Sequence, residues 1–117
     1  MTNLRMGTIE SKFAEIIWKN EPIPSPELVK LTAISLDWKK STTYTVLKKL
    51  CLKGIFHNEK GIVTSIMSKD DYYSILIEEI LDEGFRSSLS DFIQVFIKRK
   101  GISDNEKERI MEIITKK

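Results

Sequence analysis

At one place along this chain of 117 residues, the apolar residues change from a helical to a strand-like spacing, and this change limits the possible folds. Over most of the sequence they recur every three or four positions, as on the buried face of a helix. Two short β-prone runs, Ile55–His57 and Ile62–Met67, instead flank an Asn-Glu-Lys-Gly turn. The sequence therefore predicts a mainly α fold with a small β-hairpin.

Three helical segments are expected before the hairpin. The first covers residues 9–20 and ends at the stretch Asn-Glu-Pro-Ile-Pro, since proline cannot continue a helix. The second starts with Ser25 as N-cap and Pro26 in the first helical position, and is expected to be about two turns long. The third runs from about Lys40 to Lys53 and stops at Gly54. Helix, short helix, helix and hairpin is the order of a winged helix-turn-helix.

Three further helical segments follow and carry many large apolar side chains. Ser68 begins the first, Gly84 interrupts it, and Ser103 begins the last with the spacing of a capping box. Burying these side chains in a monomer would need a second layer that the sequence does not provide, so we expect a two-fold partner. The residues expected at this dimer interface are Leu76, Ile80, Leu81, Phe85, Leu89, Phe92, Ile93, Phe96, Ile97, Ile110, Ile113 and Ile114.

Basic residues are concentrated in the first half of the chain. Residues 1–66 contain ten Lys and Arg against six Asp and Glu, whereas residues 67–117 contain nine against eleven. Within residues 38–60 there are six lysines and one acidic residue, Glu59. A basic patch of this kind attracts a polyanion. Charge and apolar spacing both change near Met67, where we expect a domain boundary.

The third helix begins with a run of small hydroxylated residues, which are indifferent helix formers, and contact with DNA would explain them. In a helix-turn-helix protein, the N-terminal part of the second helix of the motif enters the major groove. Short hydroxyl side chains reach bases without forcing the helix away, and a threonine methyl can pack on a thymine methyl. The expected base-reading residues are Ser41, Thr42, Tyr44 and Thr45. The expected phosphate contacts are Lys39, Lys40, Lys48, Lys49 and, at the hairpin tip, Lys60.

Other interpretations of these residues stay open. A lysine-rich outer face is often a solvated surface without a ligand, and Ser41 is a good N-cap in its own right. The basic face would also suit a winged-helix protein-interaction module that docks an acidic protein partner. A small enzyme built on Cys51 would need a thiol that reacts quickly in the native state, and we expect the thiol not to do so.

The rare residue types limit the possible chemistry. Cys51 is the only cysteine and His57 the only histidine, which leaves no intrachain disulfide and no His/Cys set for zinc. We expect no catalytic residue, no metal, no cofactor and no small-molecule substrate. No apolar run approaches the roughly 20 residues that a membrane span needs, so we expect a cytoplasmic protein.

Four blocks of the sequence carry a resemblance to a known family. They are IIWKNEPIPSPEL, WKKSTTYTVLKKLCLKGIF, MSKDDYYSILIEEILDEGF and SLSDFIQVFIKRKGISDNEKERIMEII, and they cover nearly the whole chain in order. Together they resemble the penicillinase-repressor (BlaI/MecI/CopY) family. The resemblance implies a homodimeric repressor that binds an inverted repeat in a promoter. It also implies a winged-helix DNA-binding domain over residues 1–67 and a three-helix dimerisation arm over residues 68–117.

Some positions depart from the family pattern. Tyr44 stands where relatives often have a basic or amide side chain, and Ile62 takes a wing position often held by arginine. The cysteine cluster of the copper-responsive branch is missing, so thiolate metal sensing is not expected. In the β-lactam branch, a membrane-bound sensor protease cuts the arm before a phenylalanine. The matching bond here is Val95–Phe96, which lacks the asparagine typical of that branch, and proteolytic induction is left open.

Overall fold

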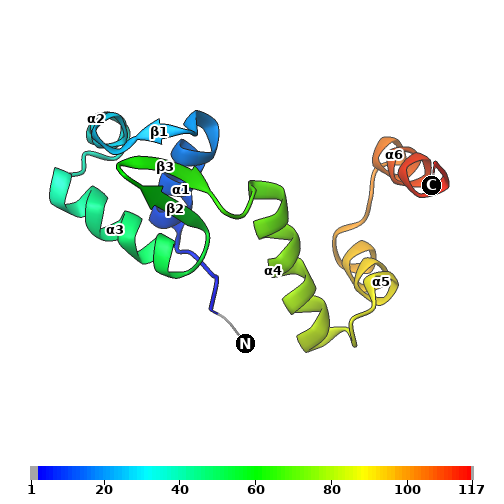
Figure 1. The fold of residues 1–117 in the computed structure, drawn as a ribbon. Helices are drawn as coiled ribbons and strands as arrows, with labels where there is room; N and C mark the ends of the chain where they lie inside the picture. Colours follow the sequence, from blue (N-terminus) through cyan, green and yellow to red (C-terminus); the bar gives the residue numbers. More distant parts are fainter. Residues whose placement is uncertain (1–2, 117) are drawn as a thin grey trace. The chain divides into compact units, whose positions relative to one another are not determined.

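The structure, a computed structural model, describes residues 3–116, and its chain divides after Leu76 into two compact units. The described residues form six α-helices and one three-stranded antiparallel sheet. The predicted fold class, mainly α with a small β-hairpin, is therefore confirmed. In the first unit, the elements follow the winged-helix order (Figure 1).

The first unit begins with the helices α1 (Thr8–Asn20), α2 (Ser25–Leu36) and α3 (Lys40–Leu52). Local contacts fix the start of α1 and the end of α3. The Glu10 carboxylate accepts a hydrogen bond of 3.0 Å from the N–H of Gly7, just before α1. Gly54, just beyond α3, has a φ of +82°, a conformation that glycine adopts without strain.

α2 is longer than the sequence predicted. It has 12 residues, about three turns, and its N-cap is Pro24, so that Ser25 is already helical. In the last turn, Ile34 is 83% exposed, whereas Leu36 is partly buried against the core. Asp37 ends the helix in the left-handed conformation, with a φ of +56°.

The sheet contains the predicted hairpin and one strand that the sequence did not predict. β2 (Phe56–Glu59) and β3 (Ile62–Ser65) pair antiparallel, and Lys60 and Gly61 connect them with positive φ at both positions. Two positive φ values are typical of the tight turn that matches the twist of a hairpin. β1 (Ile23–Pro24) pairs with the other edge of β3, which makes β3 the central strand.

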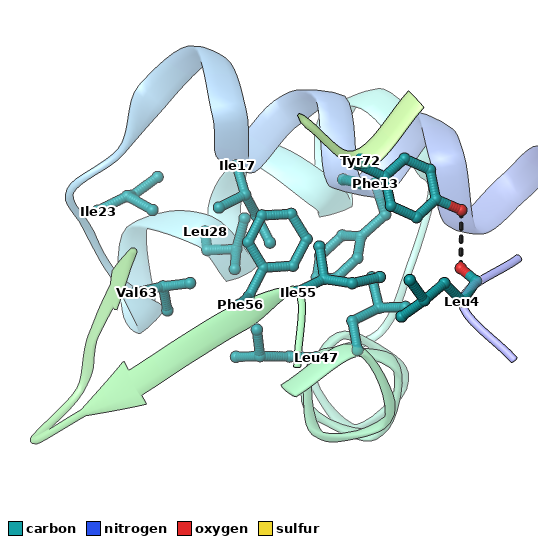
Figure 2. Close-up of a cluster of buried hydrophobic side chains, with 12 residues drawn as sticks. Leu4, Phe13, Ile17, Ile23, Leu28, Leu47, Ile55, Phe56, Val63 and Tyr72 are labelled. Carbon is teal, nitrogen blue, oxygen red and sulfur yellow. Dashed lines mark hydrogen bonds between the residues drawn. The ribbon is translucent and has the colours of Figure 1, made fainter. Parts of the chain in front are cut away.

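One hydrophobic core lies among these helices and strands (Figure 2). Each element contributes side chains that are almost completely removed from solvent, in the positions that helical or strand spacing places on one face. The most deeply buried large apolar residues of the three helices and the hairpin are Phe13, Ile17, Leu28, Leu47, Leu50, Ile55, Phe56 and Val63.

α4 (Lys69–Gly84) begins within the first unit. Its N-cap is Ser68, as predicted, whose hydroxyl accepts a hydrogen bond from the N–H of Asp71. Tyr72, in the first turn, is 1% exposed and belongs to the core of the first unit. The compact unit therefore extends beyond the boundary expected after Met67, and the assignment of functional domains to residues 1–67 and 68–117 stays a prediction.

The second unit contains the end of α4 followed by α5 (Leu89–Lys100) and α6 (Asp104–Thr115). Serine hydroxyls cap both helices: Ser88 accepts from the N–H of Asp91, and Ser103, as predicted, accepts from the N–H of Glu106. Neither α5 nor α6 has a buried residue. Their apolar side chains are thus incompletely covered within a single chain.

Candidate nucleic-acid interface

α3 has an inner face that attaches it to the core and an outer face of polar side chains. Thr43, Leu47 and Leu50 point inward and are at most 1% exposed. Ser41, Thr42, Thr45, Lys48 and Lys49 are exposed, and their spacing of three and four residues places them together on the outer face. The structure thus brings three of the four predicted base-reading residues onto one accessible surface, while their contact with bases stays a prediction.

Tyr44 differs from the other three predicted base readers. Its side chain is only partly exposed, and its hydroxyl donates a hydrogen bond of 3.0 Å to Oγ of Ser25 at the start of α2. Ser25 is itself buried, and its N–H donates to the carbonyl of Gly61. Tyr44 therefore helps to hold α3 against α2, which competes with the base-reading role predicted for it.

Thr43 joins α3 to α2, a role that the sequence analysis did not predict. Its hydroxyl lies 2.6 Å from the hydroxyl of Thr32 on α2, which also donates to the carbonyl of Val29. Both threonines are at most 1% exposed, so this bond joins the two helices of the helix-turn-helix inside the core. The spacing of Thr43 from Leu47 already places it on the apolar face, and that signal could have found it.

The predicted phosphate contacts fall into two groups. Lys39, Lys40, Lys48 and Lys60 are exposed and form no ion pair with the residues that the structure describes. Lys49, by contrast, has its ammonium 2.7 Å from the carboxylate of Glu10 on α1. A phosphate would have to compete with Glu10 for this lysine.

The Glu10 carboxylate also caps α1, and both contacts change its acidity. The hydrogen bond from Lys49 holds the pKa of Glu10 below its ordinary value of 4.5, the N–H of Gly7 adds to this effect, and partial burial opposes it. The carboxylate form is therefore favoured in the folded chain.

We expect the Glu10→Gln variant to be less stable than the wild type at neutral pH, and to lose this deficit on acidification. Because the folded pKa is lowered, the carboxylate stabilises the fold above its unfolded pKa near 4.5, and this contribution is lost as the pH falls through the folded pKa. Urea unfolding at a series of pH values measures the difference. Glu59→Gln, which alters an exposed residue of β2, is the matched control. A deficit that persists unchanged in acid would contradict this assignment.

The hairpin side of α3 forms a shallow, open groove of about 440 Å³, lined by Tyr44, Leu47, Lys48, Cys51, Phe56, His57, Asn58 and Ile66. Cys51 is half-buried there, and burial raises the pKa of its thiol, although the backbone of Asn58 opposes this. A raised pKa leaves less of the reactive thiolate at neutral pH. This environment argues against a nucleophilic role for Cys51.

The predicted dimer residues of α5 and α6 form an apolar stripe that is only partly covered. Phe92 meets Phe85 edge to face and Phe96 at a tilt, with ring centroids 5.4 and 5.5 Å apart. Leu81 is 9% exposed, and seven others are partly exposed: Leu76, Ile80, Phe85, Phe92, Ile93, Ile97 and Ile110. The remaining four are exposed by about half or more: Phe96 49%, Leu89 56%, Ile114 60% and Ile113 62%. Val95, at the predicted cleavage bond, is 54% exposed.

Residues 3–116 offer neither a metal site nor a membrane-spanning helix. No three His, Cys, Asp or Glu side chains gather there as metal ligands. No helix of this part of the chain combines the length and the apolar composition that crossing a membrane requires.

Comparison with known proteins agrees with the resemblance seen in the sequence. The sequence model of the penicillinase repressor family matches residues 6–116. The chain is 23% identical to the penicillinase repressor of Bacillus licheniformis over 114 residues, which cover 94% of this chain and 89% of that protein. It is 19% identical to the methicillin resistance regulatory protein MecI of Staphylococcus aureus over 116 residues, which cover 96% and 94%.

Proposed function

Because this chain belongs to the penicillinase repressor family, we propose that it is a dimeric, DNA-binding transcriptional repressor that occupies an inverted-repeat operator. The observation that carries the proposal is the outer face of α3. Ser41, Thr42 and Thr45 are exposed at the start of this helix, while its inner face is fixed to the core. A rigid helix that presents short polar side chains is suited to the major groove.

The start of α3 also suits the DNA backbone. Its first turn contains no acidic residue, and its N-cap, Lys39, makes no side-chain hydrogen bond to the helix. The free N–H groups and the helix dipole favour an anion at this end. Lys39 and Lys40 add positive charge beside it, so that a phosphate bound here would orient the helix over the bases.

Two copies of the chain would give the protein its affinity for an operator. Reading helices that bind half-sites about 34 Å apart, one turn of DNA, must be joined to each other. Linking them makes the second contact intramolecular, which raises affinity by about two to four orders of magnitude. The uncovered apolar stripe of α5 and α6 supports dimerisation, because a second copy would remove it from water.

We also propose that a membrane sensor protease relieves repression by cleaving the Val95–Phe96 bond. Cutting there would separate half of α5 and all of α6 from the rest, including Phe96 and Ile110 of the apolar stripe. The bond lies inside a helix, so it must unwind locally before it can be cut. A cut arm would leave two weak monovalent DNA binders.

We expect the purified chain to select an inverted repeat from a random pool of DNA duplexes. The enriched half-sites should lie one helical turn apart, and sedimentation of the complex should show two chains per duplex. The preference for this operator over random DNA should reach about three orders of magnitude or more. Failure to enrich any motif would contradict the proposal and favour the alternative, a module that docks an acidic protein partner.

A further inference from the structure

The segment that precedes α1 is tied to α4 on one side and to α3 on the other. We define residues 4–7 as the N-terminal strap. Tyr72 of α4 lies against it, and its hydroxyl makes two hydrogen bonds to the backbone of the strap. It donates to the carbonyl of Leu4 at 2.8 Å and accepts from the N–H of Met6 at 3.1 Å (Figure 2 shows the first). Leu4 is only 8% exposed and belongs to the core, and Met6 packs against that core.

The other attachments of the strap lie at the C-terminal end of α3. The ammonium of Lys53 donates to the carbonyl of Arg5 at 2.6 Å. The N–H of Gly7 donates to the carboxylate of Glu10, which forms an ion pair with Lys49 of α3. The strap therefore connects the first turn of α4 to the end of α3 opposite the predicted reading residues.

We infer that Tyr72 is a positioning residue for DNA reading, which fixes the angle of α3 through the strap, together with the bonds of Thr43 and Tyr44 to α2; this inference rests on the proposed repressor function. Thr42 lies about 16 Å along the helix from Lys53, at 1.5 Å per residue. A rotation of α3 by about 5° around its C-terminal end would move Thr42 by roughly 1.5 Å. Hydrogen bonds tolerate only a few tenths of an ångström, so base contacts would be lost.

Base contacts and phosphate contacts should respond differently to such a rotation. Ser41 and Thr42 have short side chains that cannot follow a displaced base edge. Lys48 has a flexible four-carbon stem, so its ammonium can still reach a phosphate. Loosening the strap should therefore reduce the preference for the operator more than it reduces binding to DNA in general.

The test compares full-length Tyr72→Phe with the wild type. The variant keeps the ring in the core and removes only the hydroxyl, and Tyr73→Phe, on the exposed neighbour, is the matched control. The probes are the duplex enriched from the random pool and a scrambled duplex of the same length. We expect exchange of the Met6 amide proton to accelerate about tenfold. The ratio of affinities for the two duplexes should fall about tenfold, while scrambled-duplex binding changes less than twofold.

Lys53→Met removes the bond from Lys53 to the carbonyl of Arg5 and so loosens the strap at the end of α3. The test then does not depend on whether Tyr72→Phe folds normally. Loss of the lysine charge alone would weaken binding to both duplexes equally. A fall in the ratio of the two affinities therefore reports on the strap. If Met6 exchange is faster in both variants but the ratio of affinities for the two duplexes is unchanged, the inference is overturned and the strap only stabilises the fold. The proposed repressor function would not be affected by that result. A wild-type chain without operator preference would instead overturn the proposed function, and the inference with it.

Discussion

The Phe96→Asp variant is expected to be monomeric and to lose about two to four orders of magnitude in operator affinity. Phe96 is 49% exposed and packs against Phe92 within the apolar stripe of α5. A second copy that covers this stripe would bury the new carboxylate without a partner, which is strongly unfavourable. The core of the first unit does not include Phe96, so each monomer should keep a folded reading helix.

Sedimentation and DNA binding, measured on the same samples, separate the two parts of this prediction. Gln94→Asp is the matched control, because it introduces the same charge on an exposed position of α5 outside the apolar stripe. This control should remain a dimer with wild-type affinity. If Phe96→Asp sediments as a dimer, the interface has been placed incorrectly. If it is monomeric and still binds the operator tightly, the mechanism of two linked reading helices is incorrect.

The Thr42→Ala variant is expected to lose discrimination between operator and random DNA. A good base contact contributes about 1–3 kcal/mol of discrimination, so operator affinity should fall roughly 5- to 150-fold per half-site, with random-DNA affinity unchanged. Thr42 is exposed and alanine is the better helix former, so the substitution should not weaken α3. A loss of binding would therefore report on contact with DNA.

Lys48→Ala gives the contrasting result that identifies a phosphate contact. It should weaken binding to both kinds of DNA alike and reduce the slope of log affinity against log salt by about one unit. Competition binding over a range of salt concentrations measures both variants. Equal losses on operator and random DNA for Thr42→Ala would refute its role as a base reader.

Much of this fold is encoded in signals between neighbouring residues. The apolar spacing of α1 and α3, the caps at Ser68 and Ser103 and the two runs of the hairpin all depend on residues within a few positions of one another. Such signals act through backbone geometry, which is the same wherever the segment lies in the protein. For this reason the exposure of Ser41, Thr42 and Thr45 could also be predicted.

The length of α2 and the formation of β1 depend on tertiary contacts, which local sequence signals do not encode. β1 contains only Ile23 and Pro24, too few residues for a strand pattern, and it forms because the central strand β3 offers it a free edge. The last turn of α2 exposes Ile34, while Thr32 earlier in the helix is buried and its hydroxyl is bonded to Thr43. These features follow from packing and not from local spacing.

The sequence by itself determined which helices form and which face of α3 is polar, because three- and four-residue spacing sets both. Only the tertiary structure decided that Tyr44 is bonded to Ser25, that Lys49 is held by Glu10 and that Tyr72 ties down the N-terminal strap. Each of these contacts joins side chains from different elements. Which partners meet depends on how the elements pack, and no single stretch of sequence contains that information.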